Sequence, residues 1–207
     1  MSGELTNREL PRFVAPMLAK PGKPFDSDDF LFEIKWDGTR MLAYSDRHGY
    51  RLVNRHGHER TGQYPELELL RKFPPGTILD GEMVVLVNGK PDFGKLLSRE
   101  QTCASLKIRM LARALPATYV AFDLLYARYE PLLDQPLEKR RARLRKLLEG
   151  QALSSVVLSE GVVGQGRAFF EQVCRYGLEG VVAKRLESRY LPGKRAGDWI
   201  KIKPGWE

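Results

Sequence analysis

Short β-type runs, separated by glycine or charged turns, occupy much of the chain from residue 31 onward and constrain its fold most strongly. The first three, at residues 31–36, 41–45 and 50–54, are rich in apolar side chains and have the length of ordinary strands. Similar runs follow at residues 78–87, 120–126, 180–184 and 198–203. The chain is therefore expected to form β-sheets.

Three segments have helical spacing of their apolar residues instead: 65–73, 137–148 and 168–176. They fall among pairs of strands, without the regular strand–helix–strand alternation of a parallel sheet, and this indicates an α+β fold. Residues 1–30 are rich in proline and glycine. They predict an irregular leader packed on a domain that spans residues 31–207.

The chain carries a positive charge, with 34 Lys and Arg against 26 Asp and Glu, a formal net charge of +8. Such an excess suits a polyanionic partner such as nucleic acid, but it is equally consistent with a basic, soluble surface. Cys103 and Cys174 lie far apart without a CxxC pair, which predicts neither a disulfide framework nor a zinc site and fits a reducing cytoplasm. No apolar run or N-terminal signal indicates a membrane.

Lys35 is the candidate nucleophile. It ends an apolar run and is followed by Trp36 and by the turn Asp37-Gly38. A lysine amine has a reference pKa of about 10.4 and attacks only when neutral, so a nucleophilic lysine needs desolvation or neighbouring cations. We expect those cations to come from later strands, at Lys184, Lys201 and Lys203.

Lys201 and Lys203 alternate with Ile200 and Ile202, so in a strand both amines point to the same face. Two lysines on the end of a strand can hold an α-phosphate and stabilise charge during phosphoryl transfer. An amphipathic edge strand with solvated lysines explains the same pattern.

Carboxylates break two apolar strands, at Asp80-Gly81-Glu82 and at Glu179-Gly180. Acids in such surroundings are unfavourable unless they are paired or bind a metal, and acids from two strands can hold Mg²⁺ against substrate phosphates. Asp-Gly and Glu-Gly are also common turns that can simply flank strands.

Other residues have a plain structural explanation beside a functional one. Phe122, in an apolar run, is either core or a ring that stacks on a purine. His56 and His58 predict a surface loop, and residues 161–166, which lack the Lys-Ser/Thr ending of a P-loop, predict a turn. The basic helix, whose cations include Arg140, Arg141, Arg143, Arg145 and Lys146, predicts a solvated face, with contact to DNA as the alternative.

Five elements taken in order resemble the nucleotidyltransferase motifs of ATP-dependent DNA ligases. They are Lys35-Trp36-Asp37-Gly38-Thr39-Arg40, Leu79-Asp80-Gly81-Glu82, residues 119–123, residues 179–184 and residues 199–203. Residues 190–195, before Asp198-Trp199, look most like the bacterial end-joining type. The resemblance covers almost the whole chain and implies an adenylation domain of antiparallel β-sheets flanked by helices, similar to ATP-grasp folds.

The resemblance implies that Lys35 attacks the α-phosphate of ATP, releases pyrophosphate and holds AMP through a phosphoramidate bond. Glu33 would reach the adenine amino group, Ile34 would offer backbone contacts and Phe122 would stack on the ring. The phosphates and ribose would be contacted by cations: Arg40, Arg55, Lys184, Lys201 and Lys203. Glu82, if not bound to the ribose hydroxyls, would hold Mg²⁺ or Mn²⁺ together with Glu179.

The implied substrate is nicked or broken duplex DNA, joined during repair in the bacterial cytoplasm on the nucleoid. The chain stops just after the fifth motif, so no OB-fold domain is expected within it, and an OB-fold or DNA-binding partner could act in trans. A nucleotide- or DNA-binding accessory module and an RNA ligase stay open as alternatives. A GTP-using capping enzyme fits less well, because Glu33 as an acceptor suits the amino group of adenine.

Overall fold

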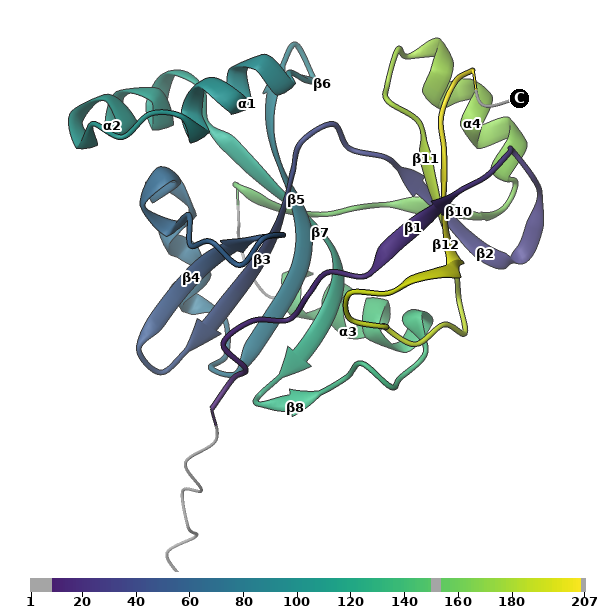
Figure 1. The fold of residues 1–207 in the computed structure, drawn as a ribbon, viewed down its shortest axis with the longest axis horizontal. Helices are drawn as coiled ribbons and strands as arrows, with labels where there is room; N and C mark the ends of the chain where they lie inside the picture. Colours follow the sequence, from purple (N-terminus) through teal and green to yellow (C-terminus); the bar gives the residue numbers. More distant parts are fainter. Residues whose placement is uncertain (1–8, 150–153, 206–207) are drawn as a thin grey trace, which may run out of the picture.

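Two β-sheets lie side by side in the computed structural model, which describes residues 9–149 and 154–205 (Figure 1). Within these residues the first sheet has five strands, in the order β1 (Leu18–Pro21), β12 (Arg195–Ile202), β11 (Val181–Arg185), β2 (Ser27–Ile34) and β10 (Gly161–Gly164). The second sheet has seven. Its main path is β4 (Gly49–Asn54), β3 (Thr39–Asp46), β5 (Thr77–Val87), β7 (Ala117–Ala127) and β8 (Glu130–Pro131), with β6 (Lys90–Pro91) on β5 and β9 (Val156–Leu158) on β7.

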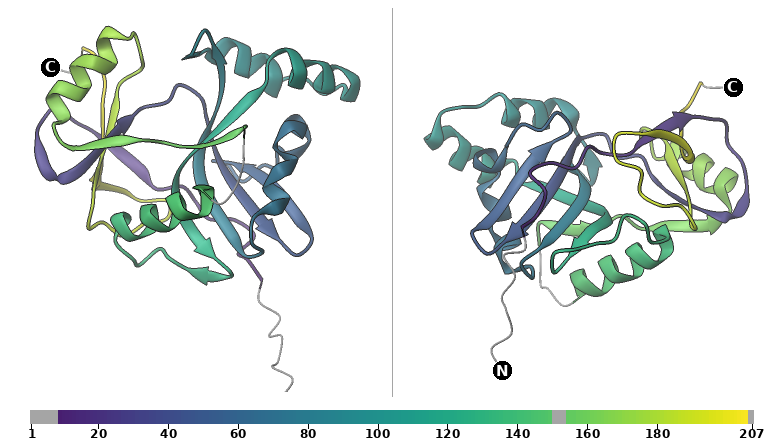
Figure 2. Two further views of the ribbon diagram at one scale, coloured as in Figure 1. Left: turned by 180° about the vertical axis from the view of Figure 1, so that it is seen from behind. Right: turned by 60° about the horizontal axis from the view of Figure 1, so that its bottom comes forward.

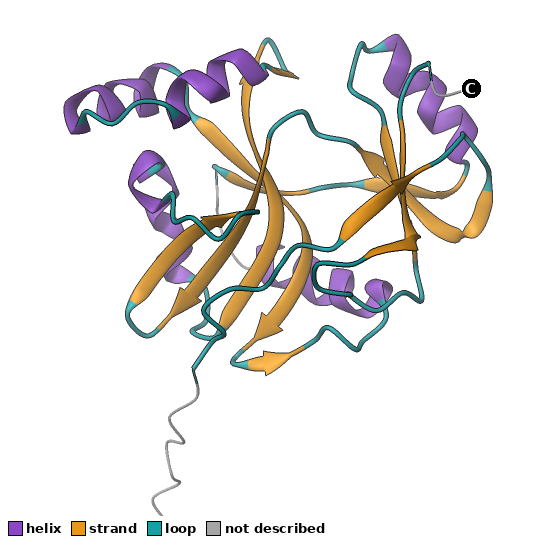
Figure 3. Ribbon diagram, viewed as in Figure 1, coloured by secondary structure: helices purple, strands orange, loops and turns teal. Residues whose placement is uncertain are grey.

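Helices cover the outer faces of both sheets (Figures 2 and 3). Helix α4 (Gly166–Arg175) packs on the five-stranded sheet, while α3 (Leu137–Glu149) packs on β7 and β9. The 3₁₀ helix η2 (Pro65–Lys72) and α1 (Phe93–Glu100) also pack on the seven-stranded sheet, near η1 (Thr61–Gln63) and α2 (Ser105–Ala114). Because most strand pairs are antiparallel and the helices lie outside them, the predicted α+β class is confirmed.

Strand β3 is buried on both faces, which explains its unbroken apolar run. Met41 and Ala43 belong to the core that η2 covers, whereas Leu42 and Tyr44 point into a second core that includes Trp199. A strand exposed on one face would alternate apolar and polar residues. The five-stranded sheet has a third core beneath α4.

Two parts of the predicted organisation are wrong. The stretch expected to be an irregular leader contains β1, which pairs in parallel with β12, and the first residues of β2; its first eight residues lie outside the described part. Residues 161–166, expected to be a turn, contain β10, which pairs with β2. In both places glycine or proline indicated a loop, but the backbone of a neighbouring strand offers enough hydrogen bonds to hold an edge strand.

The chain crosses between the sheets at residues 35–38, from β2 to β3, and at residues 159–160, from β9 to β10. The first crossing needs Gly38, because a Cβ there would lie 2.1 Å from the Met83 carbonyl oxygen. Both crossings run past the space between the sheets, so the residues beside them face it. No helix in the described residues has the length and apolar character needed to cross a bilayer.

Candidate active site

A cavity of about 610 Å³ lies between the two sheets, beside the crossing at residues 35–38. Its walls come from β2, β11 and β12 on one side and from β3, β5 and β7 on the other. Every site residue predicted from the sequence except Lys203 lines it: Glu33, Ile34, Lys35, Arg40, Arg55, Glu82, Phe122, Glu179, Lys184 and Lys201. Residues spread over much of the chain thus meet in one place.

Lys35 directly follows β2 and shares a carboxylate with Lys203. The Lys35 amine donates to Oε2 of Glu179 at 2.5 Å, and the Lys203 amine lies 2.5 Å from Oε1. Burial raises the pKa of Glu179, but the hydrogen bonds from Lys203 and Lys35 outweigh it and hold this pKa below its ordinary value. The side chain of Lys35 is 23% exposed, so a ligand in the cavity can reach it.

Gly180 places Glu179 between the two lysines. Its φ of +142° is in the region that favours glycine, and a Cβ would lie 2.2 Å from the Ile202 carbonyl oxygen. Its own carbonyl accepts from the backbone N–H of Lys35 at 2.8 Å. The start of β11, the end of β12 and the end of β2 are therefore held together at this point.

Lys201 lines the same end of the cavity from β12. Burial lowers its pKa, and so do the cations of Arg195, Lys203 and Lys35 around it. The prediction that Lys201 and Lys203 point to one side is met: one lines the cavity and the other pairs with a cavity carboxylate. An anion at this end would relieve the repulsion among the lysines.

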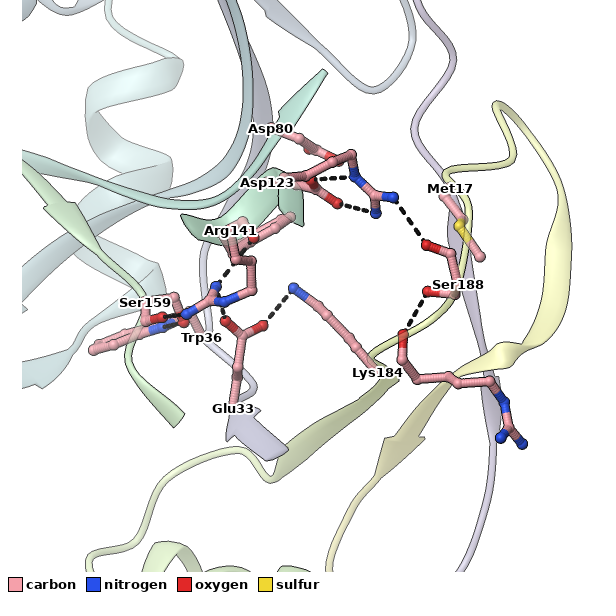
Figure 4. Close-up of polar contacts among 12 residues, drawn as sticks. Met17, Glu33, Trp36, Asp80, Asp123, Arg141, Ser159, Lys184 and Ser188 are labelled. Carbon is pink, nitrogen blue, oxygen red and sulfur yellow. Dashed lines mark hydrogen bonds and ion pairs between the residues drawn. The ribbon is translucent and has the colours of Figure 1, made fainter. Parts of the chain in front are cut away.

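Glu33, near the end of β2, is 1% exposed and is held by two cations. Oε2 pairs with Lys184, and Oε1 accepts from Nη1 of Arg141 at 2.5 Å (Figure 4). Lys184 was predicted to neutralise phosphates, but here its partner is Glu33. Burial lowers the pKa of Lys184, against the ion pair with Glu33, which raises it.

Arg140 and Arg141 correct the prediction that the basic helix has a solvated face. Arg140 is fully buried, with Nε 2.8 Å from Oδ1 of Asp123, and Arg141 reaches Glu33. The helical spacing contained the signal, because positions 140 and 141 fall between Leu137 and Leu144 on the apolar stripe. Three further cations of the helix are exposed, as predicted, namely Arg143, Arg145 and Lys146, and so is Lys139.

Phe122 is 7% exposed, as expected of a core residue, and it also lines the cavity. Trp199 packs edge-on against it at a centroid distance of 6.2 Å. The Lys184 amine lies 3.9 Å and the Arg40 guanidinium carbon 4.6 Å from the ring centroid. Val182 of β11, to which the sequence assigned no separate role, is another apolar residue of the wall.

Arg40 forms a two-pronged ion pair with Asp80, a partner that the sequence reading did not assign to the site. Nε lies 2.5 Å from Oδ1 and Nη2 lies 2.6 Å from Oδ2. The Tyr190 hydroxyl donates to Oδ2 of Asp80 at 2.6 Å. Asp80 is fully buried within β5, so the turn explanation for Asp80-Gly81-Glu82 is wrong.

Arg55 lies at the exposed edge of the cavity, in the loop after β4. Its Nε donates to Nε2 of His56 at 3.1 Å. The Asn54 side chain shapes this loop by accepting from the backbone N–H groups of His56 and His58, each at 3.0 Å. Both histidines are exposed, as a surface loop requires.

Glu82 is the carboxylate most suited to a metal. Burial, helped by the charges of Asp80 and Glu179, raises its pKa to about 8 against the opposing effect of the Arg40 and Lys35 cations. A divalent cation would relieve this excess of negative charge, so Glu82 and Glu179 fit Mg²⁺ held partly by substrate phosphates. Among the described residues no group of three or more His, Cys, Asp or Glu forms a complete protein-only metal site.

Comparison with known proteins places this site in a family. Residues 16–203 match the ATP dependent DNA ligase domain. The multifunctional non-homologous end joining protein LigD of Pseudomonas aeruginosa is 36% identical over 197 residues, which is 94% of this chain and 22% of LigD. The SPbeta prophage-derived DNA ligase-like protein LigB of Bacillus subtilis is 33% identical over 192 residues, covering 92% of this chain and 67% of LigB.

A solved structure of mycobacterial DNA ligase D complexed with ATP and MES superimposes with a TM-score of 0.77 at 34% identity. The match covers 92% of this chain and 60% of the mycobacterial one. The chain thus spans about a fifth of the length of P. aeruginosa LigD, and the predicted adenylation-domain fold is confirmed. The chain belongs to the family of ATP-dependent DNA ligases.

Proposed function

We propose that this chain transfers AMP from ATP to the amine of Lys35. The Lys35 ammonium separates from Glu179 and loses a proton to water, and the neutral amine attacks the α-phosphorus of ATP, forming a nitrogen–phosphorus bond. The nitrogen gives up a second proton to water as this bond forms. The bond from the α-phosphorus to the oxygen that bridges to the β-phosphate breaks, and pyrophosphate departs. AMP remains as a phosphoramidate on Lys35.

The observation that carries this proposal is the pairing of Lys35 and Lys203 on one carboxylate at the wall of a cavity with Phe122. A phosphate that enters between these amines can replace the carboxylate as their partner. Lys203 and Lys201 then stay beside the α-phosphate and stabilise the charge that develops there. The backbone of Lys35 is held in place by its hydrogen bond to the Gly180 carbonyl oxygen.

The rest of the cavity suits the nucleoside and the remaining phosphates. Phe122 offers a ring for stacking on adenine, and Glu33 offers an acceptor for the exocyclic amine, with the backbone of Ile34 nearby. Arg40 and Arg55 reach toward ribose and phosphates. Glu82 and Glu179 would hold Mg²⁺, or Mn²⁺ in its place, and the bound ion would neutralise part of the phosphate charge.

We propose further that the AMP passes to the 5′-phosphate of nicked or broken duplex DNA, in repair on the bacterial nucleoid. The end-joining name of the LigD relative and the net charge of +8 support a DNA substrate. Binding of the duplex could be completed by an OB-fold or another DNA-binding partner.

A sealing assay tests this second step. The protein is incubated with Mg²⁺, ATP and a duplex that carries a single 5′-phosphorylated nick, with and without an added OB-fold domain. Joined product is expected, and Lys35→Ala should give none. The same nick flanked by RNA tests the RNA ligase alternative, which gains support if only the RNA substrate is joined.

A protein that bound the nicked duplex but joined neither substrate under any of these conditions would act as a binding module. That result would overturn the proposal for strand joining.

A further inference from the structure

Glu33 is a buried carboxylate whose two oxygens are held by cations from different parts of the fold. Its side chain is 1% exposed, and an uncompensated carboxylate at this depth would be strongly unfavourable. Lys184 pairs with Oε2, and Arg141 donates to Oε1 at 2.5 Å. Each oxygen of Glu33 thus has a cation as its partner.

The two cations differ in what they fix. Lys184 stands on β11, which pairs with β2, and so belongs to the same sheet as Glu33. Arg141 comes from α3, on the other sheet, and its guanidinium also donates to the carbonyl oxygens of Phe122 at 3.1 Å and Ser159 at 2.6 Å (Figure 4). Arg141 therefore sets the distance between the Glu33 carboxylate on one sheet and Phe122 on the other.

The second crossing between the sheets is held at the same point. Ser159 lies between β9 and β10. Its carbonyl oxygen accepts from Arg141, and its hydroxyl accepts from Nε1 of Trp36 at 3.3 Å. Trp36 belongs to the first crossing, next to Lys35. One guanidinium thus connects the acceptor, the aromatic wall and both crossings.

The chemistry of a purine gives this arrangement a consequence. A 6-amino group donates hydrogen bonds, whereas the 6-oxo group of guanine or hypoxanthine accepts them. An ionised carboxylate has about four acceptor positions, so Glu33 can keep both cations and still accept from a ligand. It would attract a 6-amino group and repel a 6-oxo group, provided that its position relative to the stacked ring is fixed.

On the basis of the proposed function, we propose that Arg141 is a positioning residue that fixes Glu33 against Phe122 and thereby makes the site select 6-aminopurine nucleoside triphosphates. Lys184 alone keeps Glu33 neutralised when Arg141 is replaced. The fold is therefore expected to survive the substitution while the acceptor loses its fixed direction.

The test compares ATP with purine riboside triphosphate, which has hydrogen in place of the 6-amino group. Wild-type protein should form lysyl-AMP from ATP faster than the analogue adduct, by about tenfold or more, as expected for one hydrogen bond to a charged group. In Arg141→Gln this preference should fall to about threefold or less, chiefly through a slower reaction with ATP. Arg145→Gln, an exposed arginine on the same helix, is the matched control and should keep the preference.

An Arg141→Gln protein that reacts more slowly with both nucleotides by the same factor would overturn the proposal, because Arg141 would then only support the fold. So would a wild-type protein that does not distinguish the two nucleotides. If circular dichroism shows that Arg141→Gln does not fold, Arg141→Lys replaces it; this variant keeps the charge but not the planar fork, and the same loss of preference is expected.

Equilibrium binding of the two nucleotides to Lys35→Ala, with and without Arg141→Gln, separates this inference from the proposed function. If protein that keeps Lys35 forms no adduct, but nucleotide binding to Lys35→Ala prefers ATP and this preference depends on Arg141, then AMP transfer fails and the inference stands. If protein that keeps Lys35 forms adducts but binding to Lys35→Ala shows no preference for ATP, the inference fails while the proposed AMP transfer stands.

Discussion

Glu82 and Glu179 face the same cavity, but their charges are stabilised very differently. Glu179 forms ion pairs with the amines of Lys35 and Lys203, each at 2.5 Å, and its pKa lies below the ordinary value. Glu82 is half-buried, and its pKa is raised to about 8 although the Arg40 and Lys35 cations lower it. At neutral pH and without metal, Glu179 is therefore ionised while Glu82 is mostly protonated. The charge state of the cavity in the neutral range depends on Glu82.

Glu82→Gln should flatten the dependence of folding stability on pH. The folded pKa of about 8 exceeds the reference value of 4.5, so the folded state binds more protons between these values. The stabilising contribution is complete below about pH 4.5 and is lost as pH rises through about 8, with a slope of at most about 1.4 kcal/mol per pH unit.

Urea unfolding of wild type and Glu82→Gln, without metal and across this pH range, measures the difference. Glu68→Gln, at an exposed glutamate on η2, is the control and should behave as wild type. If the free energy of unfolding changed with pH equally in wild type and Glu82→Gln, the raised pKa of Glu82 would be contradicted.

Gly38→Ala should destabilise the fold by about 1–3 kcal/mol, because the new Cβ would be placed 2.1 Å from the Met83 carbonyl oxygen. Gly197→Ala, in β12, has no atom within 4 Å of the added Cβ and should be nearly neutral. Thermal melts of the two variants give the comparison. Equal stability of both would mean that the crossing does not require a glycine.

Helix α3 shows how an element can carry polar residues into a core. Its stripe from Leu137 to Leu144 is buried, and Arg140 and Arg141 lie within it. Arg140 meets Asp123 of β7, with both side chains fully buried, and Arg141 meets Glu33 of β2. The helix therefore ties together the two sheets between which the cavity lies.

Arg140→Met should destabilise the protein by about 3–5 kcal/mol, because Asp123 would stay buried without its cation. Arg145→Met, on the exposed face of the same helix, should change stability by less than about 1 kcal/mol, since its pair with Glu160 is solvated. Chemical denaturation measures both. A loss of less than about 1 kcal/mol in Arg140→Met would show that Asp123 finds another partner.

At the scale of the whole molecule, the cavity lies where the connections from β2 to β3 and from β9 to β10 pass from one sheet to the other. Gly38, at the first crossing, and Gly180, before β11, allow neighbouring backbone segments to approach closely. Lys35 and Glu179 thus come from distant parts of the chain and form an ion pair. The site belongs to the arrangement of the sheets rather than to one loop.

This arrangement explains what the sequence could predict. Local motifs pointed to Lys35, which precedes the Asp37-Gly38 turn, to Glu179, which precedes Gly180, and to Lys203, which ends an alternating strand pattern. They did not identify the partners of Arg141, because a basic helix does not reveal that Glu33 lies across the sheet, 108 residues away. Strands β1 and β10 were missed because their pairing partners, rather than their own composition, make them strands.

The net charge of +8 predicts salt-dependent binding to DNA. The affinity for a nicked duplex should fall as salt rises from about 50 to about 200 mM, with a slope of log affinity against log salt of about −3 or steeper. Fluorescence anisotropy measures it, and an intact duplex should give a similar slope because phosphates carry no information about the nick. An affinity that did not change with salt would contradict electrostatic binding.

The intact mass of the protein after incubation with ATP and Mg²⁺ tests the central claim most directly. Wild-type protein should gain the mass of one AMP, peptide mapping should place it on Lys35, and Lys35→Ala should gain none. Lys203→Ala should gain AMP more slowly, because one cation beside the α-phosphate is lost. If wild type gained no mass with Mg²⁺ or Mn²⁺, or if Lys35→Ala gained as much, the role assigned to Lys35 would be wrong.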